Sequence, residues 1–156
     1  MSLIEYGTGS EPPAEDIIQN TDFWPDIDPG HFRGTQRVDS GMTSARVLHQ
    51  LRIAISDVNR RLQDWQAAQV EEGAQTVDDL VPPVSQPADF YQTHYLQAVY
   101  CTAHAALLER YRDYSATSPG ESPGEMKDLA ADDYRRDAHW AVARIIDTTN
   151  ITVELI

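Results

Sequence analysis

Positive charge is scarce in this chain of 156 residues: 12 lysines and arginines stand against 25 aspartates and glutamates, and the net charge is −13. A surface that binds nucleic acid by neutralising phosphates needs the opposite balance. The composition therefore argues against such a surface, although it is compatible with a channel through which DNA slides without binding. The charge is uneven, because residues 1–42 carry eight acids and two arginines, whereas residues 43–72 carry four of each.

Cysteines, long apolar runs and glycine-rich loops are also scarce. The single cysteine, Cys101, excludes an intramolecular disulfide and is typical of a reducing cytosol. Residues 1–20 lack the basic and apolar regions of a signal peptide, and no apolar run reaches the roughly 18 residues that span a bilayer. No glycine-rich phosphate loop opens a helix. We therefore expect one soluble domain with one core, made in the cytoplasm and without a membrane segment.

The longest helical pattern covers residues 43–72, and we expect the rest of the chain to be organised around it. Thr43 is suited to cap its start and Gly73 to follow its end. Partner helices in the same chain favour an intramolecular bundle over a coiled coil. Apolar residues recur along one face of this helix at spacings of three and four: Leu48, Leu51, Ile55, Val58, Leu62 and Trp65.

One further helix is expected before this one in the sequence, and another after it. Asp28 followed by Pro29 reads as the cap and first residue of a short helix that ends before residue 39. A longer helix is expected from about 88 to 116. Its small residues allow a neighbouring helix to approach closely: Ala98, Ala103, Ala105 and Ala106.

A proline-rich loop and a last helix complete the helical part. Residues 82–87 hold three prolines and must form a loop, preceded by one short turn that Thr76 opens. Ser122 and Glu125 match a capping box around Pro123, which predicts a fourth helix to about residue 148. The expected fold is all-α: a small bundle of three main helices plus a short N-terminal helix, with an extended N-terminal arm and a strand-like C-terminal tail.

The two ends differ from the helical domain at residues 17–148. Residues 1–16 are rich in Gly, Pro, Ser and acids, and we interpret them as a flexible acidic arm. Residues 149–156 form a tail with the alternating apolar pattern of a strand. A lone strand finds no backbone partners in a helical chain. The tail either lies over its own bundle or docks on another chain, by β-augmentation or by insertion into a groove.

The sequence contains one tempting constellation for chemistry. His94, Cys101 and His104 share a helical face and are ligand types that suit zinc, but a fourth ligand is not at hand, and packing explains them better. An apolar setting raises the pKa of the Cys101 thiol and makes it inert. Asp26 and Asp28 read as turn and cap residues rather than as a Mg²⁺ site. We expect no catalytic, cofactor-binding or metal-binding residue.

Charged residues border the apolar faces of the last two helices. Arg110 falls on the apolar face itself, and Arg136 lies in an acidic and basic cluster of the next helix. We expect Arg110 or Arg136 to form a cross-helix ion pair, which would fix the register of the two helices more than it would stabilise them.

Five segments in one order resemble a known family. They are IIQNTDFWPDIDPGHFR (17–33), the helix ending in LQDW, AVYCTAHAALLERYRDYSATSPGE (98–121), RRDAHWAVARI (135–145) and TVELI (152–156). Together they look like the head completion (head stabilisation, L protein) family of contractile-tailed temperate bacteriophages. The likeness covers roughly residues 15–156, although none of the segments is specific by itself.

The resemblance implies a structural role and no enzymatic activity. Proteins of this family dock on the portal vertex after DNA packaging and form a ring below it, usually taken to match the portal symmetry and hence dodecameric. They retain the genome and offer the surface on which the tail assembles. The implied partners are the portal protein, neighbouring copies in the ring and a downstream tail or neck protein, while DNA passes through the channel without specific binding. The implied location is the virion neck, after assembly in the cytoplasm of the bacterial host.

Partner binding is expected where the chain leaves the helical scaffold. The residues concerned are Phe23, Trp24, Asp26, Ile27, Ile151, Thr152, Val153, Glu154, Leu155 and Ile156. Two other classes remain open. A small helical regulatory or scaffold protein would bind a partner through a groove or its tail and would be a monomer or dimer. A helical metal-dependent hydrolase would contain a metal and depend on His94 or His104.

Overall fold

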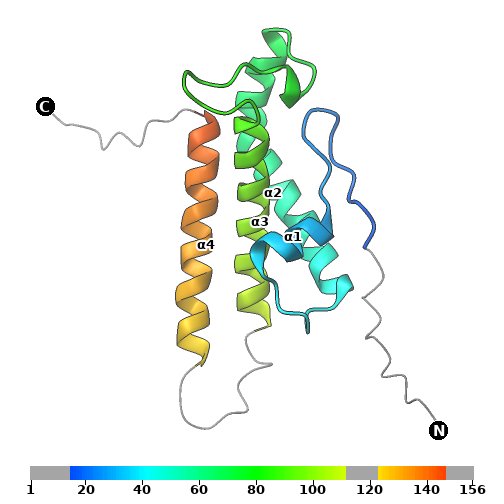
Figure 1. Cartoon of the computed structure of the whole chain (residues 1–156), viewed down its shortest axis with the longest axis vertical. Coiled ribbons are helices and arrows are strands. Elements are labelled where there is room, and N and C mark those ends of the chain that lie inside the picture. Colours follow the sequence, from blue (N-terminus) through cyan, green and yellow to red (C-terminus); the bar gives the residue numbers. More distant parts are fainter. Residues whose placement is uncertain (1–14, 112–122, 147–156) are drawn as a thin grey trace, which may run out of the picture.

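Helices form most of the computed structural model, which describes residues 15–111 and 123–146 (Figure 1). They are α1 (Pro29–Gln36), α2 (Ser44–Glu71), the short 3₁₀ helix η1 (Val77–Asp79), α3 (Phe90–Arg110) and α4 (Pro123–Ile146). The predicted all-α class is confirmed. None of the helices in the described part of the chain combines the length and hydropathy that a membrane span requires.

The caps of α1 and α2 follow the local signals in the sequence. The Asp28 carboxylate accepts hydrogen bonds from the backbone N–H groups of Gly30 and His31, at 2.8 and 3.3 Å. The Thr43 hydroxyl accepts one from Arg46 N–H at 3.4 Å. Gly73 follows α2 with φ of 109°, a conformation that glycine adopts most readily. The buried face of α2 contains most of the predicted stripe, while Leu48 and Trp65 are half-buried.

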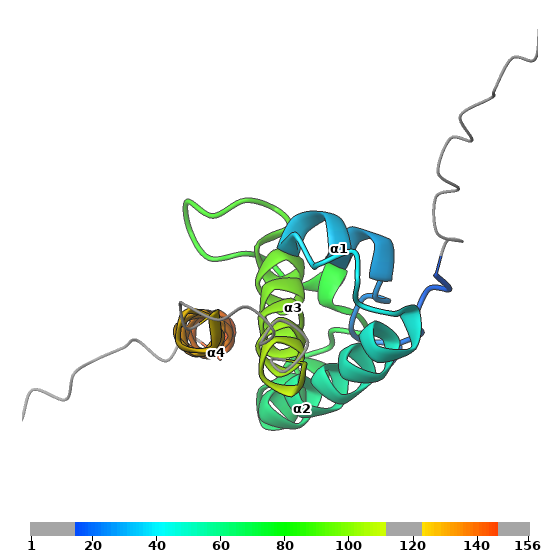
Figure 2. The ribbon, with the colours of Figure 1, turned by 90° about the horizontal axis from the view of Figure 1, so that it is seen from below.

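The centre of the bundle is α3 and not α2, which corrects the expected arrangement. α3 contacts α1, α2, η1 and α4 (Figures 1 and 2). A helix with apolar residues around most of its circumference is a buried helix. The clean stripe of α2 instead marks a helix with one side in solvent. Ten residues of α3 are buried: Phe90, Tyr95, Ala98, Val99, Tyr100, Cys101, Ala103, His104, Ala105 and Leu107.

The most extensive contact in the bundle joins α3 and α4, which lie side by side and antiparallel. Buried alanines on both helices let them approach closely, as the small residues of α3 predicted. By contrast, α2 contacts α4 at few points, and one of them is the 3.3 Å contact between the Arg61 guanidinium and the His139 ring. The buried alanines are Ala98, Ala103 and Ala105 in α3 and Ala131, Ala138, Ala141 and Ala143 in α4.

The end of α3 was predicted too late in the chain. The helix ends at Arg110 and Tyr111 is its cap, whereas the apolar spacing predicted an end near residue 116. The Tyr111 ring lies under the Arg46 guanidinium of α2 at 4.4 Å, a tertiary contact that periodicity cannot register. α4 begins at Pro123 as predicted and ends at Ile146, close to the predicted residue 148.

Within the described residues, the ion pair that crosses between α3 and α4 does not use the predicted arginines. Arg135 of α4 pairs with Glu109 of α3, one turn beyond the buried Ala105. Arg136 instead pairs with Asp133 and Asp137 of its own helix. Arg110 is exposed. For Arg136 the prediction was therefore wrong, and among the described residues the face of α3 toward α4 continues through Glu109.

Candidate partner-binding surfaces

Residues 18–27, which precede α1, form a loop that is fixed to the bundle. The backbones of Ile18 and Ile27 exchange two hydrogen bonds of 2.8 and 2.9 Å and close the intervening residues into a loop. Inside this loop, Asp26 accepts a hydrogen bond from the backbone N–H of Asn20 at 2.8 Å. The loop is therefore a structured element, although residues 18–27 contain no helix and no strand beyond this single bridge.

A closed ring of three side-chain hydrogen bonds holds this loop against α2 and α3. The Asn20 amide donates to the Tyr95 hydroxyl at 2.7 Å, Tyr95 donates to the Asn59 carbonyl oxygen at 2.6 Å, and Asn59 donates to the Asn20 carbonyl oxygen at 3.0 Å. The second Asn20 donor reaches the backbone carbonyl of Pro25 at 3.0 Å. Burial raises the pKa of Tyr95 above its usual range, so the hydroxyl stays protonated and can donate.

Trp24 is the apolar anchor of the loop. Its ring stacks on Tyr95 with 4.3 Å between ring centres and on Trp65 at 6.0 Å, and its indole N–H donates to the Gln66 side chain at 2.9 Å. The neighbouring Phe23 carbonyl accepts a hydrogen bond from Val77 N–H of η1 at 2.9 Å. The loop is thus packed into the core by its aromatic residues.

The four residues of this segment that were expected to bind a partner differ in their exposure. Phe23, Trp24 and Ile27 are buried in the core of their own chain, and only Asp26 is exposed. Partner binding by the segment stays a prediction, and its exposed residues would have to make the contact. The other predicted residues, Ile151, Thr152, Val153, Glu154, Leu155 and Ile156, lie outside the described residues.

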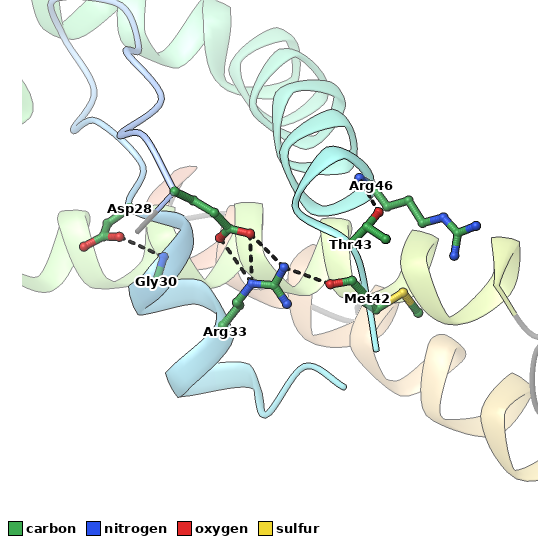
Figure 3. A network of polar contacts seen from close by, with 7 residues as sticks. Asp28, Gly30, Arg33, Met42, Thr43 and Arg46 are labelled. Atoms are coloured by element: carbon green, nitrogen blue, oxygen red, sulfur yellow. Dashed lines mark hydrogen bonds and ion pairs between the residues drawn. The ribbon is translucent and has the colours of Figure 1, made fainter. Parts of the chain in front are cut away.

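An ion pair ties the end of the predicted acidic arm to α1 (Figure 3). The Arg33 guanidinium donates to both carboxylate oxygens of Glu15, at 2.7 to 3.2 Å, and also to the Met42 carbonyl at 2.9 Å. Arg33 thereby joins the N-terminal segment to the connection between α1 and α2. The hydrogen bonds from Arg33 lower the pKa of Glu15.

The histidines and the cysteine of α3 have packing roles. The His104 ring stacks on Tyr134 at 4.2 Å and contacts the Gln36 amide oxygen at 3.1 Å, and burial lowers its pKa to about 4. Burial, followed by the charge of Asp137, raises the pKa of Cys101 to about 11, as its apolar setting predicted. His94 packs edge-on against Phe90. Among the described residues, no three His, Cys, Asp or Glu side chains are placed to hold a metal ion.

A strongly acidic end of the bundle was missed by the sequence reasoning. Residues 62–109 contain seven acids and no lysine or arginine. Most of these acids gather where α2 ends, η1 lies and α3 begins, at the top of Figure 1. The gap in basic residues is readable from the sequence, but only the fold places the acids together. The exposed acids at this end are Glu71, Glu72, Asp78, Asp79 and Asp89.

Comparison with known proteins gives the family. The model of the phage head completion protein family (GPL) matches residues 18–156, which is nearly the whole chain. This chain belongs to the phage head completion family. It is also 30% identical over 143 residues to the head completion/stabilization protein of Escherichia phage P2, and the match covers 92% of this chain and 82% of that protein. No solved structure matches.

Membership confirms the resemblance that the five sequence segments carried. The phage head completion family is one of structural phage proteins and not of enzymes, and membership makes this chain a component of the virion. The packed roles of His104 and Cys101 agree with a structural protein. The acidic end and the anchored N-terminal loop are therefore surfaces to be considered for assembly rather than for catalysis.

Proposed function

We propose that this protein docks under the portal after DNA packaging, forms a ring there, retains the genome and provides the surface to which the tail attaches. The observation that carries the proposal is the family match over residues 18–156. The ring would be dodecameric, with the portal protein on one side and a downstream tail or neck protein on the other. These contacts would be made in the virion neck, after assembly of the protein in the host cytoplasm.

The charge of the chain supports a role around a DNA channel. A net charge of −13 keeps DNA from binding the wall, because like charges repel. DNA would then pass through the ring without specific contacts. Charge-reversing substitutions on the channel wall should disturb packaging, retention or ejection of DNA, and particles that perform all three normally would contradict this part of the proposal.

The tail at residues 150–156 is the proposed contact with another chain. A chain truncated after Thr149 should keep its helical circular dichroism spectrum and thermal midpoint, because residues 18–146 supply a continuous apolar core of their own. It should no longer bind the portal from the same phage in sedimentation experiments. Normal portal binding by the truncated chain would refute the docking role of the tail.

The oligomeric state tests the ring directly. Light scattering and electron microscopy of the protein, with and without its portal, should show a ring on the portal. A stable dimer under both conditions would instead favour the alternative of a small regulatory or scaffold protein that binds a partner through a groove or its tail.

A further inference from the structure

The acidic end of the bundle contains a hollow with a distinctive lining. The hollow has a volume of about 430 Å³ and lies between the end of α2, η1 and the start of α3. It is lined by Gln69, Glu72, Gly73, Ala74, Asp79, Leu80, Val81 and Tyr91. Two carboxylates and three larger apolar or aromatic side chains therefore surround one space.

The electrostatics of the hollow favour a cation. Asp79 uses one carboxylate oxygen to accept the backbone N–H groups of Gln75 and Thr76, at 2.8 and 2.9 Å. Its other oxygen, like the exposed Glu72 carboxylate, makes no hydrogen bond or ion pair with a described residue. The C-terminal end of α2 adds partial negative charge at the same place. Residues 62–109, which form this end of α2, η1 and α3, contain no lysine or arginine.

The same end exposes apolar side chains on a preformed loop. Val81 and Val84 of this loop are 85% and 94% exposed. The loop is stiffened by Pro82, Pro83 and Pro87 and is closed by a hydrogen bond of 3.0 Å from Gln86 N–H to the Pro83 carbonyl. A stiff loop loses little conformational freedom on binding, so exposed apolar residues at its tip are suited to contact another protein.

We propose that this end is a docking surface for a basic segment of another protein of the particle, with one arginine or lysine side chain in the hollow. The aliphatic stem of such a side chain would lie against Leu80, Val81 and Tyr91, and its charged group would lie between Glu72 and Asp79. Val84 would contact an apolar surface beside it. DNA and anionic lipids are disfavoured by the negative charge, and the proposal rests on the proposed role in head completion.

The chemistry can be tested on the intact chain with a peptide probe. The probe is an acetylated and amidated pentapeptide in which arginine is flanked on each side by leucine, and it is titrated into ¹⁵N-labelled protein. A peptide with citrulline in place of arginine serves as its neutral counterpart. The arginine peptide should shift the amide signals of Gly73, Ala74 and Val81, and the citrulline peptide should bind at least fivefold more weakly. Equal binding of both peptides, or shifts elsewhere only, would overturn the cation site.

Adjacent residues of α2 offer a matched pair of variants. Glu72→Gln should weaken the arginine peptide at least fivefold, because Glu72 lines the hollow. Glu71→Gln removes the same charge one residue away, does not line the hollow and should leave binding within twofold. Equal losses in the two variants would mean that only the general negative field attracts the peptide, which would overturn the specific site.

Complementation of a phage that lacks this gene product tests the docking role. The double variant Glu72→Lys, Val84→Asp should lower infectious particles at least tenfold, whereas Glu71→Lys, Val70→Asp should be close to the wild type. If the wild-type chain complements and both double variants do so equally, the docking inference fails while the proposed function stands. If the wild-type chain neither complements nor enters particles, the proposed function fails, and this inference with it. Self-association that Glu72→Lys abolishes would assign the surface to a second copy, against the inference.

Discussion

The hydroxyl of Tyr95 should matter far more for stability than that of Tyr100, although both tyrosines are buried in α3. In Tyr95→Phe, the Asn20 amide loses its acceptor and the Asn59 carbonyl loses its donor, since the hydroxyl serves both. In Tyr100→Phe, only a 2.7 Å contact with the ring nitrogen of the exposed His31 is lost. Water can replace that partner at the surface.

The size of the effect follows from these partners. An unpaired buried polar group costs about 1 to 3 kcal/mol. Asn20 and Asn59 are only half-buried, so water relieves part of this penalty, and we expect a loss of about 2 kcal/mol for Tyr95→Phe. For a chain of this length, this corresponds to a drop of about 4 to 8 °C in the unfolding midpoint. Tyr100→Phe should cost less than about 1 kcal/mol.

Urea unfolding, followed by circular dichroism at 222 nm and by tryptophan fluorescence, measures both variants. Trp24 stacks on Tyr95, so fluorescence reports on the loop as well as on global unfolding. The reasoning would be refuted if the two phenylalanine variants lost equal stability. A loss in Tyr95→Phe that persisted in an Asn59→Ala background would likewise show that the hydroxyl acts alone and not within the ring of hydrogen bonds.

Three further properties follow from the buried and paired groups. Burial lowers the pKa of His104 to about 4, so the unfolded chain binds a proton before the folded chain does as the pH falls. The free energy of unfolding should therefore decrease between about pH 6.5 and 4, by at most about 3 kcal/mol. In His104→Gln, the urea midpoint should lack this part of the pH dependence. The raised pKa of Cys101, about 11, lowers its thiolate fraction at pH 8 about 100-fold, so a thiol reagent should label the folded protein very slowly and the urea-unfolded protein readily. Arg33 lowers the pKa of Glu15 in the folded chain. The ion pair therefore stabilises the fold fully above the usual carboxyl pKa, and this stabilisation is lost as the pH falls through the lowered pKa. Glu15→Gln should therefore speed amide hydrogen exchange at Ile18 and Ile27 at pH 7, and a difference that did not shrink at low pH would argue against the ion pair.

Local signals in the sequence predicted most helix boundaries. Asp28 with Pro29, Thr43, Thr76 and Pro123 each act within three or four residues of their own position, so a cap or turn can be read without knowing the fold. The end of α3 could not be read in this way. It coincides with the contact of Tyr111 with Arg46, a residue far away in the sequence.

Burial of the FWPDID segment shows a second limit of the sequence. Exposed aromatic residues in a loop are typical of a binding surface, and the same residues in a covered loop belong to the core. Trp24 is covered because Asn20, Asn59 and Tyr95 hold its loop against two helices, and Asn20 and Tyr95 are 75 positions apart in the sequence. Nothing in the segment itself reveals that arrangement. The centre of the bundle was misplaced for a related reason, since α3 lacks a single apolar stripe because it is covered on several sides.

α4 ends at the same end of the bundle as the acidic hollow, which makes a joint prediction possible. α3 and α4 are antiparallel, so Ile146, where α4 ends, lies near the start of α3 (Figure 1). Burial lowers the pKa of His94, and the nearby charge of Arg144 lowers it further, so the end of α4 lies close to the start of α3. If the tail and the acidic hollow bind one partner, each raises the effective concentration of the other. Truncation after Thr149 and Glu72→Lys should then each weaken binding to that partner strongly, and their combination should abolish the single-site binding that either variant retains, when measured by sedimentation. Independent partners would leave binding to one of them intact in each single variant, which would contradict a shared docking end.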